Sequence, residues 1–214
     1  MNIAKNSVKR LGAAKPIATE YDRRREELVG AAAMVFKEKG FAATTVDDIG
    51  RRAKMDRATV YYYFRGKKEL FREMVNEATS ENVHMAERAA NLDQPARQKL
   101  RQLIEGLLQS YVKHYPYLYV YVQEDMLRLS KDGSAWGKQM IALNHRFDHA
   151  VFKIVQEGLQ TGDFSSDSDP KLVAAGIIGM CNWTHRWFDP TGQVSSAELA
   201  RVFSDLVLSG LLPR

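Results

Sequence analysis

The sequence predicts an all-α fold with a small N-terminal three-helix unit of helix-turn-helix type and a larger helical C-terminal domain. Apolar residues recur at helical spacing through most of the 214 residues. Residues that cap or break helices punctuate this pattern, and residues 44–68 contain two short helical patterns separated by a tight turn. We therefore divide the chain into a basic flexible arm at 1–20, a small domain at 21–68 and a large domain at 69–214.

The small domain is expected to contain three helices. Apolar residues at i, i+4 and i+8 predict the first helix from Asp22, and Gly40 is expected to end it. Thr45 and Asp56 are typical N-caps, so they predict where the second and third helices begin. A fourth helical pattern at 67–90 then leads into the large domain.

The large domain is expected to be helical throughout, although one segment has the pattern of a strand. Residues 115–122, Y-P-Y-L-Y-V-Y-V, alternate with a period of two and are rich in aromatic and β-branched residues. A single strand among helices would have no partner, so we expect a helix here with Pro116 in its first turn. The other helices are predicted at about 95–111, 136–160, 170–188 and from 195 onward.

Positive charge is concentrated in the first third of the chain. The net charge of the whole chain is +5. Residues 1–70 hold 16 lysines and arginines against 9 acidic residues, a net of +7, whereas the remainder has a net of −2. A local basic surface attracts polyanions such as nucleic acid. A basic face that is merely solvated would give the same count, so charge alone leaves both interpretations open.

The third predicted helix has the features of a recognition helix. At 100° per residue, Val60 and Phe64 lie on one side, and Ala58 and Tyr62 on the other. The N-terminal residues of such a helix reach base edges in the major groove, so base contacts are expected from Arg57, Ala58 and Thr59. Hydroxyls and helix starts suit phosphate contacts, which are expected from Thr45, Tyr61, Tyr62, Tyr63 and Lys67. The alternative is that the tyrosines are ordinary amphipathic packing.

Residues 26–71 resemble the DNA-binding domain of the TetR family of bacterial transcriptional regulators. The shared residues are A-A-x-x-V-F at 31–36, G-F at 40–41, T-T-V at 44–46, Ile49, Ala53, R-A-T-V-Y-Y-Y-F at 57–64, Lys67 and L-F at 70–71. The resemblance implies a homodimer that binds a near-palindromic double-stranded DNA operator with two recognition helices about one DNA turn apart. Lys54, Met55, Asp56 and Arg65-Gly66 depart from the family pattern, which would alter the turn and the operator sequence.

Two segments of the large domain also resemble parts of family members. Q-E-G-x-x-x-G-D-F at 156–164 is similar to a segment that ends a dimerisation helix. This resemblance implies a dimer interface built from helices around 140–161 and 170–188. N-W-T-H-R-W-F-x-P-x-G at 182–192 is similar to a segment of members that govern fatty-acid and steroid breakdown and respond to CoA thioesters.

A small hydrophobic effector, such as an acyl-CoA or steroid-CoA thioester, is therefore expected in the large domain. Such a ligand needs a pocket lined mainly by aromatic and aliphatic side chains, with few polar groups. The candidate ligand-binding residues are Tyr111, Tyr115, Tyr119, Met126, Phe147, Trp183, Arg186 and Trp187. Any one of these aromatic residues could instead belong to the core or to the dimer interface.

The expected function is that of a ligand-responsive repressor, which leaves its operator when the effector binds. One alternative is a TetR-type regulator of an efflux or stress gene that responds to a drug-like apolar ligand. An activator, or a DNA-binding protein without an effector, would carry the same sequence features.

Enzymatic activity is not expected. His145 and His149 have the i, i+4 spacing of metal ligands and would suit a metal-dependent enzyme, but no third ligand lies nearby in the sequence. No P-loop or dinucleotide fingerprint appears, so no cofactor is expected. The single cysteine, Cys181, fits a reducing cytoplasm. No apolar run approaches the ~20 residues of a membrane span, so no membrane association is expected.

Overall fold

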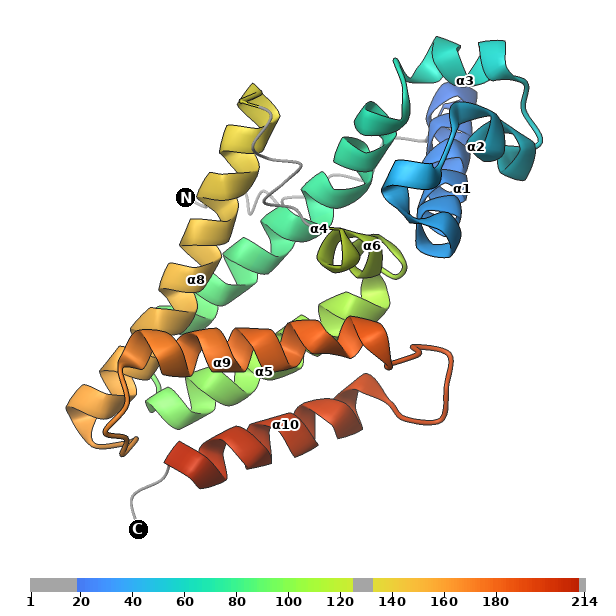
Figure 1. The fold of residues 1–214 in the computed structure, drawn as a ribbon. Helices are drawn as coiled ribbons and strands as arrows, with labels where there is room; N and C mark the ends of the chain where they lie inside the picture. The colour runs from blue at the N-terminus through green and yellow to red at the C-terminus, as the bar shows by residue number, and fades with distance from the viewer. Residues whose placement is uncertain (1–18, 125–132, 212–214) are drawn as a thin grey trace, which may run out of the picture.

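The computed structural model describes residues 19–124 and 133–211, and all regular secondary structure within them is helical (Figure 1). The fold class predicted from the sequence is therefore confirmed. The elements are α1 (Glu20–Ala43), α2 (Val46–Ala53), α3 (Arg57–Tyr63), α4 (Lys67–Ala90), α5 (Ala96–Lys113), α6 (Tyr117–Gln123), α8 (Ala135–Thr161), α9 (Pro170–Asn182), the 3-10 turn η1 (Trp183–Arg186) and α10 (Ser196–Leu211).

The short helices α2 and α3 begin at the predicted caps. The Thr45 hydroxyl accepts a hydrogen bond from the backbone N–H of Asp48 at 3.2 Å. The Asp56 carboxylate accepts one from the backbone N–H of Thr59 at 2.6 Å. Between the two helices, Lys54 adopts a left-handed conformation with φ of 55°. This turn fixes the angle between α2 and α3, although a non-glycine residue occupies its left-handed position.

The end of α1 differs from the prediction. Gly40 breaks the helix with φ of 76°, as expected, but one further turn follows and α1 ends at Ala43. This last turn is held from outside the helix. The backbone N–H of Phe41 donates to the Glu124 carboxylate, and the Lys67 ammonium donates to the carbonyls of that turn. Neither partner is close in sequence, so the extra turn had no local signal.

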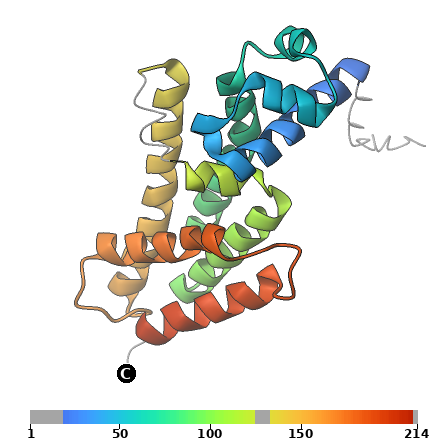
Figure 2. The ribbon, with the colours of Figure 1, turned by 45° about the vertical axis from the view of Figure 1, so that its right-hand side comes forward.

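The long helix α4 connects the helix-turn-helix unit to the body of the molecule, as Figures 1 and 2 show. Its first half contributes Leu70 and Phe71 to the core that packs beneath α1–α3. This core continues into the body through Val120 of α6 and Met140 of α8, which are both fully buried. The two parts are therefore in direct hydrophobic contact, and the division at residue 68 remains a prediction.

The body is a layered packing of α5, α8, α9 and α10, with α6 between this body and α1 (Figure 2). Residues 117–122 of the segment with the strand-like pattern are helical, as predicted, whereas Pro116 precedes α6 instead of lying in its first turn. The helix predicted at 170–188 is shorter than expected, because α9 ends at Asn182. The Thr184 hydroxyl donates to the Cys181 carbonyl at 2.7 Å and competes with α-helical pairing there.

Candidate DNA-binding surface and ligand pocket

The orientation of α3 is set by two buried side chains. Val60 is fully buried and Phe64 is 1% exposed, and both pack into the core beneath α1 and α4. At the start of the helix, the hydrogen bond from the backbone N–H of Thr59 lowers the pKa of the Asp56 carboxyl. The cap therefore stays ionised at neutral pH and stabilises the start of α3. One face of α3 is locked inward, and the other is left at the surface.

The residues predicted to contact base edges lie together at the exposed start of α3. Arg57 and Ala58 are exposed, and Thr59 is half-buried. The Arg57 guanidinium lies 3.2 Å from the Asp47 carboxylate of α2 and 5.5 Å from the centre of the Tyr61 ring. These contacts extend the Arg57 side chain along the surface, away from the buried side of the helix.

The three consecutive tyrosines have different environments. Tyr62 is 72% exposed and Tyr61 is also exposed, so both hydroxyls are accessible to a phosphate backbone. Tyr63 is half-buried and packs against Tyr21 of α1, with ring centres 4.9 Å apart. Tyr61 and Tyr62 therefore fit the predicted phosphate contacts better than Tyr63, which joins α3 to α1.

Thr45 lies at the N-terminus of α2, next to this surface. Its hydroxyl is already engaged with Asp48, to which it donates at 2.7 Å and from which it accepts at the backbone N–H. Hydrogen bonds, first from Lys39 and then from Thr45, lower the pKa of the Asp48 carboxyl. The residue acts mainly as a helix cap here, and a phosphate contact by Thr45 remains a prediction.

Lys67 donates three intramolecular hydrogen bonds, which the sequence did not suggest. Its ammonium group donates to the carbonyl oxygens of Phe41 at 2.8 Å, Ala42 at 3.0 Å and Thr44 at 2.8 Å. These are the free carbonyls at the end of α1. All three N–H bonds of an ammonium are thus directed at this helix end. Lys67 therefore caps α1 and ties it to the start of α4, and a phosphate contact by Lys67 remains a prediction.

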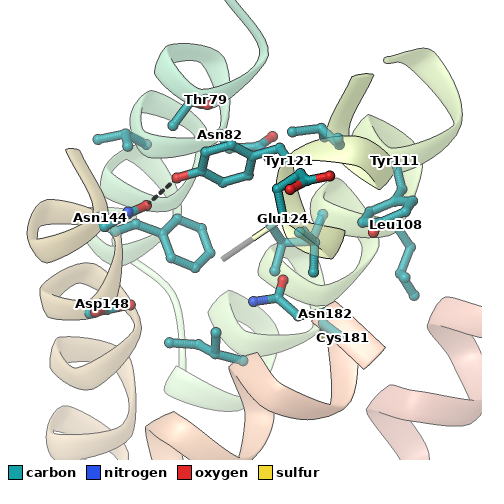
Figure 3. Close-up of a pocket in the computed structure, with 16 residues that line it drawn as sticks. Thr79, Asn82, Leu108, Tyr111, Tyr121, Glu124, Asn144, Asp148, Cys181 and Asn182 are labelled. Atoms are coloured by element: carbon teal, nitrogen blue, oxygen red, sulfur yellow. Dashed lines mark hydrogen bonds between the residues drawn. The ribbon is translucent and has the colours of Figure 1, made fainter. Parts of the chain in front are cut away.

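The body contains a cavity of about 430 Å³ between α4, α5, α6, α8 and α9 (Figure 3). Apolar side chains supply much of its wall, including Val83, Leu108 and Phe147. The polar lining residues are amides, hydroxyls and carboxylates: Thr79, Asn82, Tyr111, Tyr121, Glu124, Asn144, Asp148 and Asn182. The volume and the mostly apolar wall are those of a small-molecule site.

Two buried polar atoms in this wall find no hydrogen-bond partner within the described part of the chain. They are the Tyr111 hydroxyl and the Asn82 side-chain oxygen. Burial raises the pKa of Tyr111, so its hydroxyl keeps its proton and can donate. An unpaired buried polar group costs about 1–3 kcal/mol. A ligand that pairs with these atoms would recover part of that cost.

Two of the predicted ligand-binding residues, Tyr111 and Phe147, line this cavity. Met126 falls outside the described residues. Tyr115 and Tyr119 do not line the cavity. They face α1, where the Lys37 ammonium lies 4.6 Å and 5.5 Å from their ring centres.

Tyr115 and Tyr119 are predicted pocket residues because aromatic side chains suit an apolar ligand. Residue type alone does not say which side of α6 faces the cavity. The cavity receives Leu118 and Tyr121 from α6 instead.

The other predicted ligand-binding residues lie at the surface. Trp183 is 58% exposed and Trp187 is 53% exposed. Arg186 is also exposed, and its guanidinium carbon lies 5.0 Å from the centre of the Trp183 ring. The 3-10 turn buries Thr184 and His185 in their place. Trp183, Arg186 and Trp187 are thus outside the cavity, because the chain after α9 turns their side chains outward.

The sequence pattern missed most of the polar lining residues. Thr79 and Asn82 lie three positions apart on the side of α4 that also carries Val83 into the cavity. A polar residue on the apolar side of a predicted helix is a usable signal. Asn144 has a similar position on α8, where its side-chain oxygen accepts a hydrogen bond from the Tyr121 hydroxyl at 2.8 Å (Figure 3).

A metal site has no support in residues 19–124 and 133–211, where no group of three or more His, Cys, Asp and Glu side chains could hold an ion. His145 and His149 are exposed on α8, and the ring of His149 packs 6.4 Å from that of Phe152. Within the same residues, no helix has both the length and the apolar character needed to cross a bilayer.

The fold and its two sites define a helix-turn-helix DNA-binding protein with a ligand-sized cavity in a separate body. Residues 28–74 match the family model described as bacterial regulatory proteins of the tetR family. Residues 93–211 match the model described as the tetracyclin repressor-like C-terminal domain. The chain therefore belongs to the TetR family of bacterial transcriptional regulators, which are not enzymes.

Individual members of the family are similar over most of the chain. The transcriptional repressor NicS of Pseudomonas putida is 30% identical over 207 residues, which cover 91% of this chain and 95% of NicS. The ketosteroid transcriptional regulator KstR2 of Mycobacterium tuberculosis superposes with a TM-score of 0.82 at 23% identity, covering 89% and 96%. AibR, in a crystal structure with isovaleryl coenzyme A and operator DNA, gives a TM-score of 0.69 at 16% identity, covering 86% and 97%.

Proposed function

We propose that this chain is a homodimeric repressor that binds a near-palindromic operator through the α3 helices of its two subunits. The observation that carries the proposal is the exposed start of α3, where Arg57, Ala58 and Thr59 form one surface. Arginine suits guanine edges, and the methyl groups of Ala and Thr suit thymine. Tyr61 and Tyr62 are the candidate phosphate contacts. The proposed location is the cytoplasm, with the DNA.

The proposed dimer interface is formed by α8 and α9. Leu172 on α9 is 69% exposed, and Ala175, Gly176 and Gly179 are exposed on the same helix. An outward row of apolar and small residues is unusual on a monomer surface and suits close packing of a second subunit. The similarity of segment 156–164 to a dimerisation segment supports the same assignment.

The proposed effector is a small hydrophobic molecule, such as an acyl-CoA or steroid-CoA thioester, bound in the cavity of the body. The size and apolar wall of the cavity support a hydrophobic ligand. Two structural neighbours support the chemical class, since KstR2 is a ketosteroid regulator and AibR was crystallised with isovaleryl coenzyme A. The effector would favour a state with a different spacing of the two α3 helices, which releases the operator.

A drug-like ligand is the second candidate. Among the described residues that line the cavity, none is Lys, Arg or His. A neutral or cationic apolar compound would therefore meet no repulsion there. Regulators of efflux genes would respond to such a compound, so the genes next to the operator distinguish the two candidates.

The test begins with selection of an operator from random DNA by the full-length protein, followed by footprinting. We expect two related half-sites, about one helical turn apart, bound by a dimer. A titration with isovaleryl-CoA and longer acyl-CoA thioesters should then weaken operator binding at least tenfold. Selection without sequence enrichment would contradict the regulator, and unchanged DNA affinity at saturating acyl-CoA would contradict only the ligand class.

A further inference from the structure

One side chain contacts the cavity and the DNA-binding unit at the same time. Glu124 follows the last turn of α6, where its backbone N–H donates to the Val120 carbonyl at 3.0 Å. Glu124 is also one of the residues that line the cavity (Figure 3). One oxygen of its carboxylate accepts a hydrogen bond from the backbone N–H of Phe41, at 2.5 Å. A ligand in the cavity is therefore one side chain away from α1.

The receiving end of this contact is firmly attached to the DNA-binding unit. Gly40 has a positive φ, so the helix axis of α1 changes direction just before Phe41. The Phe41 ring is buried 5.2 Å from that of Phe71, and its carbonyl accepts from the Lys67 ammonium. Lys67 also binds the carbonyl of Thr44, the residue before the cap of α2. A shift of the Phe41 backbone would thus reach both α2 and the start of α4.

The charge of the cavity lining limits which ligand groups can compete with the Phe41 N–H for the Glu124 carboxylate. Its described lining contains two carboxylates, Glu124 and Asp148, and no cationic side chain. Glu124 has no ion pair within the described part of the chain, and its oxygen is paired to a neutral backbone N–H. An anionic ligand group placed here would meet like charge. A ligand N–H or O–H donor would instead form a charge-assisted hydrogen bond.

We propose that Glu124 is the residue through which the effector releases DNA, and that the effector is selected by a hydrogen-bond donor presented to this carboxylate. Amide N–H, hydroxyl and ammonium groups are such donors, whereas carboxylate and phosphate groups are not. The donor draws the carboxylate away from Phe41, and the last turn of α1 loses its tie to α6. This inference rests on the proposed function of the cavity as an effector site.

The first test uses the full-length protein and three variants. Glu124→Ala removes the acceptor, Glu124→Gln keeps an amide oxygen but loses the charge, and Gln123→Ala is the exposed neighbouring control. Hydrogen exchange at the Phe41 amide should accelerate about tenfold in Glu124→Ala and less in Glu124→Gln. Exchange in α10 should stay unchanged, and the control should match the wild type. Equal Phe41 exchange in Glu124→Ala and Gln123→Ala would overturn the proposed contact.

The second test compares three ligands of equal chain length: octylamine, octanamide and octanoate. Calorimetry should show octylamine and octanamide binding the wild type at least tenfold more tightly than octanoate. Octylamine should lose about tenfold in Glu124→Gln and should accelerate Phe41 exchange only in the wild type. If Glu124 had only a structural role, Glu124→Gln would leave the preference for octylamine over octanoate unchanged. Octanoate binding as tightly as octylamine would overturn the proposed selection.

Operator binding separates this inference from the function on which it rests. Without ligand, Glu124→Ala should bind a selected operator several-fold more weakly than Gln123→Ala does. If no operator can be selected, the proposed function fails, while the exchange and ligand tests still decide the role of Glu124. If the operator is bound equally by both variants, Glu124 is not the link to DNA.

Discussion

The α3 surface takes its residues from a single stretch at 57–63, whereas the cavity takes its residues from five helices spread over 79–182. On α3, inward and outward residues alternate along one short helix, so packing and recognition use different side chains. In the cavity, residues such as Leu108 and Cys181 belong to the core and to the cavity wall at once. Substitutions should therefore separate function from stability on α3, and mix the two in the cavity.

The largest expected effect concerns Cys181, on the cavity side of this comparison. Burial raises the pKa of its thiol from 9.0 to about 12. The reactive thiolate should therefore be about a thousandfold scarcer than in the unfolded chain. Iodoacetamide labelling at pH 8 should be slower by about two to three orders of magnitude in native protein than in guanidinium chloride. Equal rates would show that Cys181 is accessible to solvent in the native protein. The cavity wall would then not be part of a buried core, in contradiction to the comparison with α3.

The next effect concerns Lys67. This residue lies on α4, outside the α3 surface, yet its hydrogen bonds stabilise the DNA-binding unit that contains α3. Lys67→Met removes three hydrogen bonds to the end of α1 and should lower the free energy of unfolding by about 1–3 kcal/mol. Chemical denaturation measures this change. Lys68→Met is the matched control, since Lys68 is exposed at the neighbouring position. An equal effect of both substitutions would contradict the capping role.

A smaller effect should distinguish two adjacent tyrosines on α3. Tyr62→Phe removes an exposed hydroxyl and should weaken operator binding by about 0.5–1.5 kcal/mol, with an unchanged melting temperature. Tyr63→Phe should change operator binding less, because Tyr63 is half-buried against Tyr21. Fluorescence anisotropy with a selected operator measures both. The reverse order would mean that Tyr63 is the phosphate contact.

The smallest effect concerns the cap of α2. The pKa of Asp48 is lowered below its ordinary value of 3.8, first by Lys39 and then by Thr45. A carboxyl with a lowered folded-state pKa stabilises the protein above pH 3.8 and loses that contribution as the pH falls further. The melting-temperature difference between wild type and Asp48→Asn should therefore be largest at pH 5–7 and shrink toward pH 2.5. A difference that grows on acidification would contradict this assignment.

The same contrast explains what sequence analysis could predict. The caps at Thr45 and Asp56 and the inward pair on α3 depend on neighbours within four positions, so local spacing revealed them. The pKa, burial and pairing of cavity residues depend on contacts between distant segments. Tyr115 and Tyr119 are predicted pocket residues by their aromatic type, but the direction in which α6 presents its side chains depends on its packing against distant helices.

Lys67 and Glu124 show the same limit for polar residues. Lys67 resembles a phosphate contact by its place at a helix start, yet its partners lie 23–26 positions earlier. The partner of Glu124 lies 83 positions away. No local pattern marks either contact. Lys67 connects two helices of the DNA-binding unit, and Glu124 connects that unit to α6 of the body.

The most direct test of the account is a titration of a selected operator with wild type and with a variant carrying Arg57→Ala, Thr59→Ala and Tyr62→Ala. None of the three residues belongs to the buried core beneath α3, so the variant should keep its melting temperature and its dimer mass. We predict a loss of operator affinity of at least about a hundredfold. A folded dimeric variant that binds the operator as tightly as the wild type would contradict the assignment of α3 as the DNA-reading element.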